Sequence, residues 1–569
     1  MSYKAGATPG ISSMLILVIL FLFSDQSKAQ TARKRLPKNV NIALKSHIYP
    51  SLSADGMFMI LMSNYSNTGA YELKYTRKNG PESWEDPEYI ENLTRPRNDH
   101  FGSYCLSYTG NEIYYSSIRA NTIGKYDIMY SEREGNLWSV PKNLGKPINS
   151  PGNEGNPSLS PDGKTIFFMR CDEMETTTKS GCSIYMAKKK TSTLWGEPIK
   201  LPPHINSGNS TTPRILADGK TLIYSSDKEG GKGGLDLFMT RLEYGQWSQP
   251  EPLDFINSEF NDEFVSVPAR GDIIYYTAKF KDWLNIYKAR IPEHLQPNKI
   301  VMISGNVKAR GNSISNASVL IYDAETREGV MASKIESDGS FFFVIPEGEI
   351  YDFSITAKDG PLMYYSKIYD LHDMSRSNWD KLNIDLKAFQ PGNDYNLPSL
   401  SFEENSETIS NYSQLEISRL IKIMKENANN RYEFSIYMDT VKTDTISSPM
   451  LTQVHSDTLF FEIDKPQVAD SLTFSNDSTD VFDTQTMEDP SIMEGYVLFE
   501  ESDEKKIYLQ IKNTYHNDLT ISRAESLKQL FLSKGVPEYM FSIVGKGDQW
   551  TESKATPEKN YWVELKVNY

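Results

Sequence analysis

The stretch Asn156-Pro157-Ser158-Leu159-Ser160-Pro161-Asp162-Gly163-Lys164-Thr165-Ile166-Phe167-Phe168 carries the pattern that decides the fold of the N-terminal half. It predicts a strand, a tight turn and a second strand, because Asp-Gly accepts hairpin-turn geometry and apolar runs flank it. Related turns recur with their glycines 54, 53, 56 and 52 residues apart, at Asp55-Gly56, Thr109-Gly110, Asp162-Gly163, Asp218-Gly219 and Gly271-Asp272. A period this regular indicates a repeat architecture.

Each repeat contains four candidate strands. A tryptophan opens the fourth strand, at Trp84, Trp138, Trp195 and Trp247. Four short strands in about 50 residues are typical of a propeller blade, and we expect five blades. The fifth repeat lacks the tryptophan strand, so the segment from Leu36 to Val40 is expected to complete it and close the ring. A sixth, degenerate blade is the alternative.

These repeats resemble the WD40-like repeats of Tol-B-type propellers, through the pattern from Pro157 to Lys164 and the loop from Ser225 to Leu237. The resemblance covers about residues 35 to 297 and implies a scaffold or binding platform. The run from Gly230 to Gly234 is not expected to bind phosphate, because a strand rather than a helix follows it. A polar residue opens the third strand of three repeats, at Asp127, Asp236 and Asn285. This recurrence predicts a structural hydrogen bond in each repeat, and metal binding is the less favoured alternative.

Length, charge and cysteine content bound the class of protein. A chain of 569 residues predicts several domains, and a net charge of −15 argues against nucleic acid as a partner. Residues 1–29 read as a signal peptide, because Lys4 precedes a short apolar run and a small-residue cleavage site follows it. No later segment is expected to cross a membrane.

Export permits disulfides, and Cys171 and Cys182 bracket a polar loop between two candidate strands. A bridge between them is the candidate pairing, with two reduced thiols as the alternative. Cys105 is expected to be buried and unreactive. Three cysteines without matching histidines predict no zinc site, and no cofactor or other metal is expected.

The period stops after Pro297. Short alternating strands follow, and Gly305-Asn306-Val307 with Asp338-Gly339-Ser340-Phe341 resemble the small β-sandwich of carboxypeptidase regulatory-like domains over residues 301–388. The resemblance implies a spacer or adhesive module. The expected fold class is therefore multidomain and mainly β, with a propeller at residues 33–297, this sandwich, and a third domain at residues 396–569.

The third domain shows a β-α-β-α-β-β series. It resembles the C-terminal peptidoglycan-binding domain of the outer-membrane protein A (OmpA) family, through the run from Leu519 to Ala524 and through Asp439. The resemblance implies that Asp439 and Arg523 hold the diaminopimelate of a peptidoglycan stem peptide. Thr520 is expected to cap the helix from Ser522 to Lys534 and to belong to the same site.

This sequence departs from the family pattern at several places, among them His516 and Tyr561-Trp562. Met438 stands where the family has a histidine, and an acidic insertion, at about residues 444–506, separates Asp439 from Arg523. Much of the insertion is expected to be loop, although two apolar runs in it could form extra strands, at 459–461 and 496–499. An internal salt bridge between Asp439 and Arg523 in a degenerate domain is the alternative to peptidoglycan binding.

The sequence contains neither a Gly-x-Ser-x-Gly nor a His-Glu-x-x-His motif, so we predict that the chain is not an enzyme. The expected function is a tether in the periplasm, associated with the outer membrane or cell wall without a transmembrane segment. It would join a partner-binding propeller to peptidoglycan, and the partners would be unidentified envelope proteins. A role in an envelope or type IX secretion assembly is a further expectation. The alternative is a protein-interaction scaffold whose third domain binds nothing.

Overall fold

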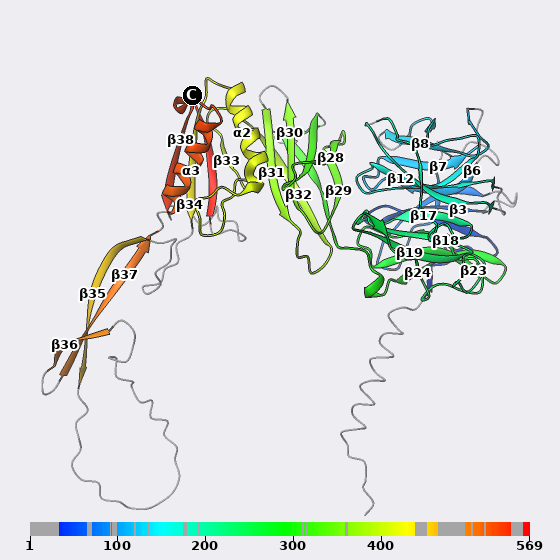
Figure 1. Cartoon of the computed structure of the whole chain (residues 1–569), viewed down its shortest axis with the longest axis horizontal. Coiled ribbons are helices and arrows are strands. Elements are labelled where there is room, and N and C mark those ends of the chain that lie inside the picture. Colours follow the sequence, from blue (N-terminus) through cyan, green and yellow to red (C-terminus); the bar gives the residue numbers. More distant parts are fainter. Residues whose placement is uncertain are drawn as a thin grey trace, which may run out of the picture. The chain divides into compact units, whose positions relative to one another are not determined.

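The structure is a computed structural model (Figure 1). It describes residues 33–64, 71–90, 93, 100–118, 121–134, 137–174, 179–191, 193–309, 312–314, 316–358, 362–438, 452–464, 496–501, 505–516, 519–547 and 561–569. The predicted signal peptide and Asp439 lie outside this part of the chain. The fold is mainly β, as predicted, and divides into two compact units. The first comprises residues 1–320, 330–350 and 370–386, and the second comprises residues 321–329, 351–369 and 387–569.

The first unit contains a propeller whose described residues form five blades. The first blade consists of β2 (His47–Leu52), β3 (Phe58–Ser63), β4 (Glu72–Arg77) and β5 (Glu88–Tyr89). The second consists of β6 (His100–Leu106), β7 (Glu112–Ser117), β8 (Asp127–Glu134), β9 (Leu137–Trp138) and β10 (Lys142–Asn143). The third consists of β11 (Asn153–Leu159), β12 (Thr165–Cys171), β15 (Ser183–Lys188) and β16 (Ile199–Lys200). The last two are built from β17 (Ser210–Ile215), β18 (Thr221–Ser226), β19 (Asp236–Glu243), β20 (Gln246–Trp247) and β21 (Glu251–Pro252), then β22 (Glu263–Ser266), β23 (Ile273–Phe280), β24 (Trp283–Arg290) and β1 (Lys34–Arg35).

The N-terminal segment closes the ring, as the sequence predicts, but the paired strand is Lys34–Arg35 and precedes the expected segment from Leu36 to Val40. Strand β1 pairs antiparallel with β24, with Lys34 opposite Lys288. Beyond β1, the Asn41 side chain bonds to both the N–H and the C=O of Ile286. Three other blades repeat this double bond, with Asn149 on Ile128, Asn206 on Ile184 and Asn257 on Leu237.

Two of the three third-strand residues make the predicted structural hydrogen bonds, whereas the Asn285 side chain donates to the Leu284 carbonyl. The Asp127 carboxylate accepts from the N–H groups of Ile123 and Gly124, and the Asp236 carboxylate accepts from those of Lys232 and Gly233. These bonds fix the loops that lead into β8 and β19. The glycine-rich run before β19 is therefore a structural loop. A Cβ at Gly233 would lie only 2.4 Å from the Phe260 carbonyl oxygen, so only glycine fits there.

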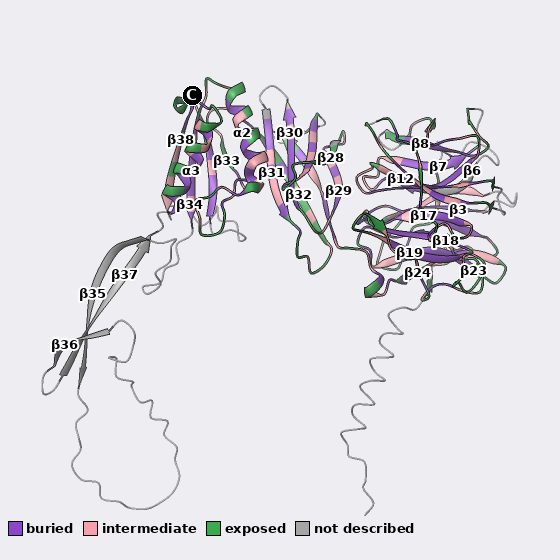
Figure 2. Cartoon of the chain, viewed as in Figure 1, coloured by how far each residue is buried: buried purple, intermediate pink, exposed green. Residues whose placement is uncertain are grey.

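An eight-stranded sheet follows the propeller in the chain, in the order β26-β25-β32-β31-β30-β27-β28 with β29 paired to β25. Its strands are β25 (Ile300–Ala309), β26 (Asn312–Ser313), β27 (Ala317–Asp323), β28 (Gly329–Lys334), β29 (Ser340–Pro346), β30 (Ile350–Lys358), β31 (Leu362–Asp370) and β32 (Asn378–Ala388). Strands β25 and β32 run parallel, whereas β25 and β29 run antiparallel. Figure 2 shows buried residues along most of these strands.

The C-terminal part of the second unit is an α+β fold. Its sheet has the order β33-β39-β34-β38, formed by β33 (Asp394–Asn396), β34 (Arg431–Met438), β38 (Phe541–Gly547) and β39 (Tyr561–Asn568). Helices α2 (Gln414–Glu426) and α3 (Leu519–Ser533) share one hydrophobic core with this sheet. The first strand of the expected series is not formed at residues 400–402, where Phe402 makes an isolated bridge to Ile409.

The insertion forms a separate three-stranded sheet of β35 (Thr452–Asp464), β37 (Lys505–His516) and β36 (Tyr496–Glu501). Both predicted apolar runs fall in these strands, and residues 465–495 lie outside the described part. Three single turns of 3-10 helix complete the description, at Glu293–Leu295, Asn411–Ser413 and Glu538–Met540. Within the described ranges, no helix is both long enough and apolar enough to cross a membrane.

Candidate functional site

The five inner strands of the propeller, β2, β6, β11, β17 and β22, are each interrupted by a bulge. Four of these bulges place a residue other than glycine at positive φ, at Tyr49 (57°), Asn156 (51°), Thr212 (49°) and Phe264 (58°). Such backbone costs energy, and it accumulates where structure serves a function. Proline follows three of them, at Pro50, Pro157 and Pro213.

The bulges meet around a cavity on the propeller axis, which we call the axial site. It is lined by Tyr49, Pro50, Tyr104, Asn156, Pro157, Thr212, Pro213, Arg214, Phe264 and Val265, so every blade contributes. The rings of Tyr49 and Phe264 lie 3.6 Å apart between centroids. Burial, with the nearby Glu263 charge, raises the pKa of Tyr49, so its hydroxyl stays protonated and able to donate.

Polar groups complete the lining of the axial site. The Asn156 side-chain oxygen is buried and has no hydrogen-bond partner in the structure, whereas the Thr212 hydroxyl lies 2.7 Å from that of Ser225. A buried polar atom without a partner is uncommon in folded proteins. Asn156 therefore offers an unused acceptor to a molecule on the axis.

Arg214 separates the axial site from a second cavity further along the axis, since its side chain lines both. The guanidinium donates from Nε to the Val265 carbonyl at 3.1 Å and from Nη1 to Cys105 Sγ at 3.4 Å. These contacts join blades four, five and two. Arg214 thus forms a floor beneath the axial site.

The axis is closed below the second cavity by apolar side chains. Ala54, Ala217 and Ala269, each two residues before the glycine of a hairpin turn, pack in one cluster with residues of β25 and β29, namely Ile300, Met302 and Val344. Tyr108, at the same position of the second blade, packs against this cluster and lines the second cavity. Access to the axial site must therefore come from the opposite end.

A short hairpin, formed by β13 (Glu173–Met174) and β14 (Lys179–Ser180), contacts residues next to the axial site. The candidate pair Cys171 and Cys182 is disulfide-bonded at its base. Lys179 Nζ lies 2.9 Å from Glu263 Oε1 and 4.8 Å from the centre of the Phe264 ring. Both charged side chains are largely buried, 10% and 14% exposed, and the pair joins the third blade to the fifth beside the Phe264 ring.

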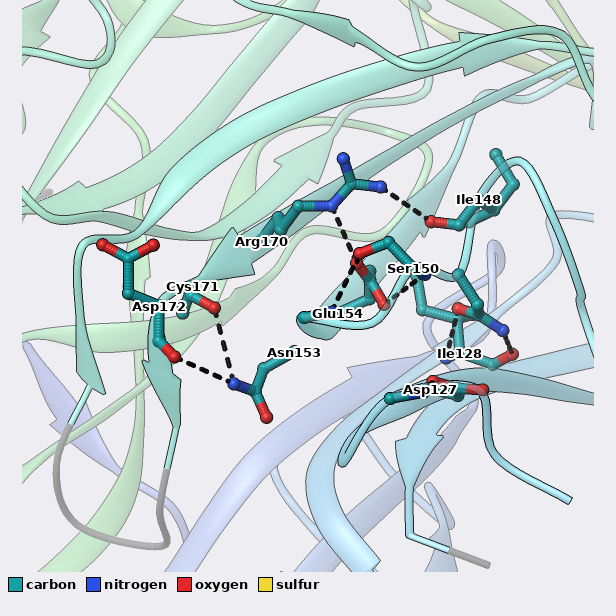
Figure 3. A network of polar contacts seen from close by, with 12 residues as sticks. Asp127, Ile128, Ile148, Ser150, Asn153, Glu154, Arg170, Cys171 and Asp172 are labelled. Carbon is teal, nitrogen blue, oxygen red and sulfur yellow. Dashed lines mark hydrogen bonds and ion pairs between the residues drawn. The ribbon is translucent and has the colours of Figure 1, made fainter.

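Two further carboxyl groups, those of Glu154 and Asp262, lie two residues before the positive-φ residues of their blades. Each is hydrogen-bonded to nearby residues of the propeller. Glu154 pairs with Arg170 at 2.7 Å and accepts from Ser150, as Figure 3 shows. Burial raises the pKa of Glu154, against the opposing effect of those partners. Asp262 accepts from the N–H and hydroxyl of Ser258, and burial raises its pKa to about 6.

The predicted peptidoglycan site is described only in part, because Asp439 lies outside the described residues. Arg523 is 1% exposed, and its guanidinium donates to the Ser406 and Glu403 carbonyls and lies over the rings of Phe402 and Tyr561. A ligand carboxylate cannot reach it without displacing this packing. Thr520 is also buried, accepts from the Gly547 N–H, and lies inside helix α3, which begins three residues before the predicted start.

Comparison with known proteins gives no family. No family model and no curated protein matches the chain. Among solved structures, a thermostable family-43 glycoside hydrolase has a TM-score of 0.31 and 13% identity, covering 44% of this chain and 94% of its own. An alpha-L-arabinofuranosidase from Lactobacillus brevis has a TM-score of 0.32 and 14% identity, covering 45% and 95%. The catalytic domain of a Coprinopsis cinerea GH62 alpha-L-arabinofuranosidase has a TM-score of 0.30 and 10% identity, covering 46% and 95%.

These findings overturn three predictions made from the sequence. The chain is not shown to be an OmpA-like protein, because no OmpA or peptidoglycan-binding family matches and the structures found are glycoside hydrolases. The glycoside hydrolase structures also contradict the predicted peptidoglycan tether and its scaffold alternative. They contradict the prediction that the chain is not an enzyme as well. At these TM-scores, the activities of those hydrolases are not carried over to this chain.

Sequence reasoning missed the axial site. Its members come from five strands that only ring closure brings together, and Lys179 lies 84 residues from Glu263. One signal was available: proline recurs at the same position of three repeats, six residues before each of the turn glycines Gly56, Gly163 and Gly219. Proline inside an inner strand indicates a bulge.

Proposed function

We propose that the propeller binds a saccharide in the axial site. The observation that carries this proposal is the combination of the Tyr49 and Phe264 rings with the unused acceptor of Asn156 around one cavity. A sugar ring presents an apolar C–H face to an aromatic ring and hydroxyl groups to polar side chains. Binding pockets combine mainly apolar walls with a few such polar groups in the same way.

Each side chain of the axial site has a role in this proposal. The ring of Phe264, already in contact with Tyr49, provides the stacking surface. Asn156 accepts from one sugar hydroxyl, and the protonated Tyr49 phenol donates to another. Arg214 closes the base of the cavity and excludes longer ligands from the lower axis.

The test is a binding titration of the full chain against neutral and acidic mono- and oligosaccharides, by calorimetry and ligand-observed NMR. We expect Asn156→Ala and Phe264→Ala to weaken binding at least about tenfold, because each removes a contact that a bound sugar needs. Tyr89→Ala is the matched control, since Tyr89 is a half-exposed ring on outer strand β5.

Two outcomes contradict the proposal. One is the absence of binding by the unmodified protein to any saccharide of the panel. The other is binding that survives both Asn156→Ala and Phe264→Ala with unchanged affinity. Chromatography of the same mixtures after incubation distinguishes binding from cleavage, since cleavage yields shorter sugars.

We also propose that the chain is exported to an oxidising compartment. The disulfide between Cys171 and Cys182 supports this, because disulfides persist outside the reducing cytosol. Mass spectrometry of the protein isolated from its native cells provides the test. A mature chain that begins near residue 30 is expected, and an intact N-terminus with reduced cysteines would contradict export.

A further inference from the structure

We propose that Arg214 forms a carboxylate-binding site at the floor of the axial site, so that the saccharide bound there is an acidic one. This inference rests on the proposed function and names the class of sugar that the site selects. Of the described residues that line the axial site and the second cavity, only Arg214 carries a charge. Both cavities are therefore lined by one positive charge and by no negative charge.

The contacts of Arg214 leave its charge unbalanced. A guanidinium has five N–H groups, and described residues accept from three of those on Arg214. The acceptors are the Val265 carbonyl at 3.1 Å, the Tyr104 carbonyl at 3.5 Å and Cys105 Sγ at 3.4 Å. None of them is a carboxylate, and no residue in the described part of the chain forms an ion pair with Arg214. Two N–H groups can thus donate to a ligand.

Two carboxylates close to the axis have other partners. Glu263, which precedes Phe264 in the chain, pairs with Lys179 at 2.9 Å. Asp218 follows Ala217 of the apolar cluster, and its carboxylate accepts from the N–H and hydroxyl of Thr221 and from the Asn298 N–H. Neither carboxylate is available to neutralise Arg214.

A carboxylate is the anion that suits this site. A partly buried charge is costly unless it is paired, and a hydrogen bond from arginine to a carboxylate is about twice as strong as one between neutral groups. One cation balances the single charge of a carboxylate, whereas a phosphate monoester carries about 1.5 to 2 charges. The acid group of a sugar would face Arg214 at the floor, while Phe264 and Asn156 contact the sugar ring.

A preference for acidic sugars would have to arise locally. The chain has a net charge of −15, so its overall field disfavours an acidic ligand. A higher affinity for an acid than for its neutral analogue therefore reports a specific cation in the site.

The experiment compares the methyl glycosides of glucuronate and galacturonate with their own methyl esters, by calorimetry and ligand-observed NMR on the full chain at pH 7. The ester keeps the shape of the sugar and removes its charge. We expect each acid to bind at least about tenfold more tightly than its ester. This comparison uses the unmodified protein, so it stands even where a change at Arg214 lowers the stability of the propeller.

Variants then assign the preference to one side chain. Arg214→Gln should bring acid and ester to equal affinity, whereas Arg214→Lys, which keeps the positive charge, should retain part of the preference. Arg241→Gln is the matched control, because it removes an arginine from β19 of the same blade. Arg241 donates to the Thr221 hydroxyl and the Gln296 carbonyl and lines neither cavity, so the preference should stay unchanged.

Equal affinity of acid and ester in the unmodified protein would overturn the inference, and so would a preference that survives Arg214→Gln. Titration with glycolate, a carboxylate without a sugar ring, separates this failure from failure of the proposed function. Glycolate binding that Arg214→Gln abolishes, with no binding of any sugar, retains the carboxylate site and removes the saccharide. Binding of neutral sugars without a preference for acids does the reverse.

Discussion

The side chain of Asn41 accepts a hydrogen bond from the Ile286 N–H and donates one to the Ile286 carbonyl, both at 2.9 Å, across 245 positions of sequence. It occupies the place that Asn149, Asn206 and Asn257 hold within their own blades. Only for Asn41 does this contact join the two ends of the ring, beside the short pairing of β1 with β24.

Asn41→Ala should lower the free energy of unfolding of the propeller by about 2 to 3 kcal/mol, because two buried backbone groups lose their partners. Urea unfolding provides the measurement. Asn39→Ala is the control, because Asn39 donates mainly to backbone carbonyls at a more exposed position. A midpoint equal to that of the unmodified protein would show that β1 alone closes the ring.

Arg523→Ala should destabilise the C-terminal part of the second unit by about 3 kcal/mol, since it empties a buried volume and leaves carbonyl groups unpaired. Hydrogen exchange of α3 and β38 in the full chain should then lose about 100-fold protection. Arg523→Lys should not restore it, because a lysine lacks the planar fork that contacts the rings of Phe402 and Tyr561.

The control for this prediction is Arg431→Ala, which removes an exposed arginine from β34. Protection of α3 should then change little. If Arg523→Ala were equally harmless, the burial of the guanidinium would not contribute to stability.

Glu416 should make the stability of helix α2 depend on pH. Burial raises the pKa of Glu416 to about 7, although Arg419, which also pairs with Asp352, opposes the shift. The folded state therefore binds the proton more tightly than the unfolded state does. The stabilisation is complete below the unfolded pKa of about 4.5 and is lost as the pH rises through about 7.

Glu416→Gln should remove this dependence. In the unmodified protein, the free energy of opening of α2, obtained from protection factors corrected for intrinsic exchange, should fall between pH 5 and pH 8. In Glu416→Gln this fall should be smaller by about 1 to 3 kcal/mol. Ser366 can still donate to the amide oxygen at this position. Glu426→Gln on the same helix is the control, because Glu426 is exposed. Parallel pH profiles for the unmodified protein and Glu416→Gln would contradict the prediction.

Gly233→Ala should destabilise the propeller by about 1 to 3 kcal/mol, because the added Cβ would meet the Phe260 and Ser258 carbonyl oxygens. Calorimetric unfolding measures this as a lower transition temperature. Lys232→Ala changes the neighbouring side chain, whose ion pair with Asp254 is exposed, and should have little effect. Equal effects of the two changes would argue against the close loop approach.

The sequence predicted what is local or periodic. The Asp-Gly turns, the blade count and the return of the N-terminal segment follow from spacing alone, because each blade repeats the same bonds. The predicted start of α3 at Ser522 is wrong, since the prediction used Thr520 as the helix cap. The Thr520 hydroxyl instead accepts a hydrogen bond from the Gly547 N–H. Such a contact between distant segments leaves no periodic trace.

The candidate site could not be predicted, for a related reason. Arg523 stands in a motif that implies a ligand, but segment 403–406, more than 100 positions away, supplies the carbonyl groups that it binds. Conversely, Asn156 is an ordinary member of a repeat until four other strands surround it. Burial and convergence are properties of the closed ring, and neither can be read from one repeat.

The apolar cluster around Ala54, Ala217 and Ala269 has a kinetic consequence. A channel closed at one end gives a bound molecule the same path for entry and for exit. A change that affects only the energy barrier along this path must alter the association and dissociation rates by the same factor. It leaves the equilibrium affinity unchanged. Residues at the open end would then set how long the propeller takes to fill, while Asn156 and Phe264 set how full it becomes.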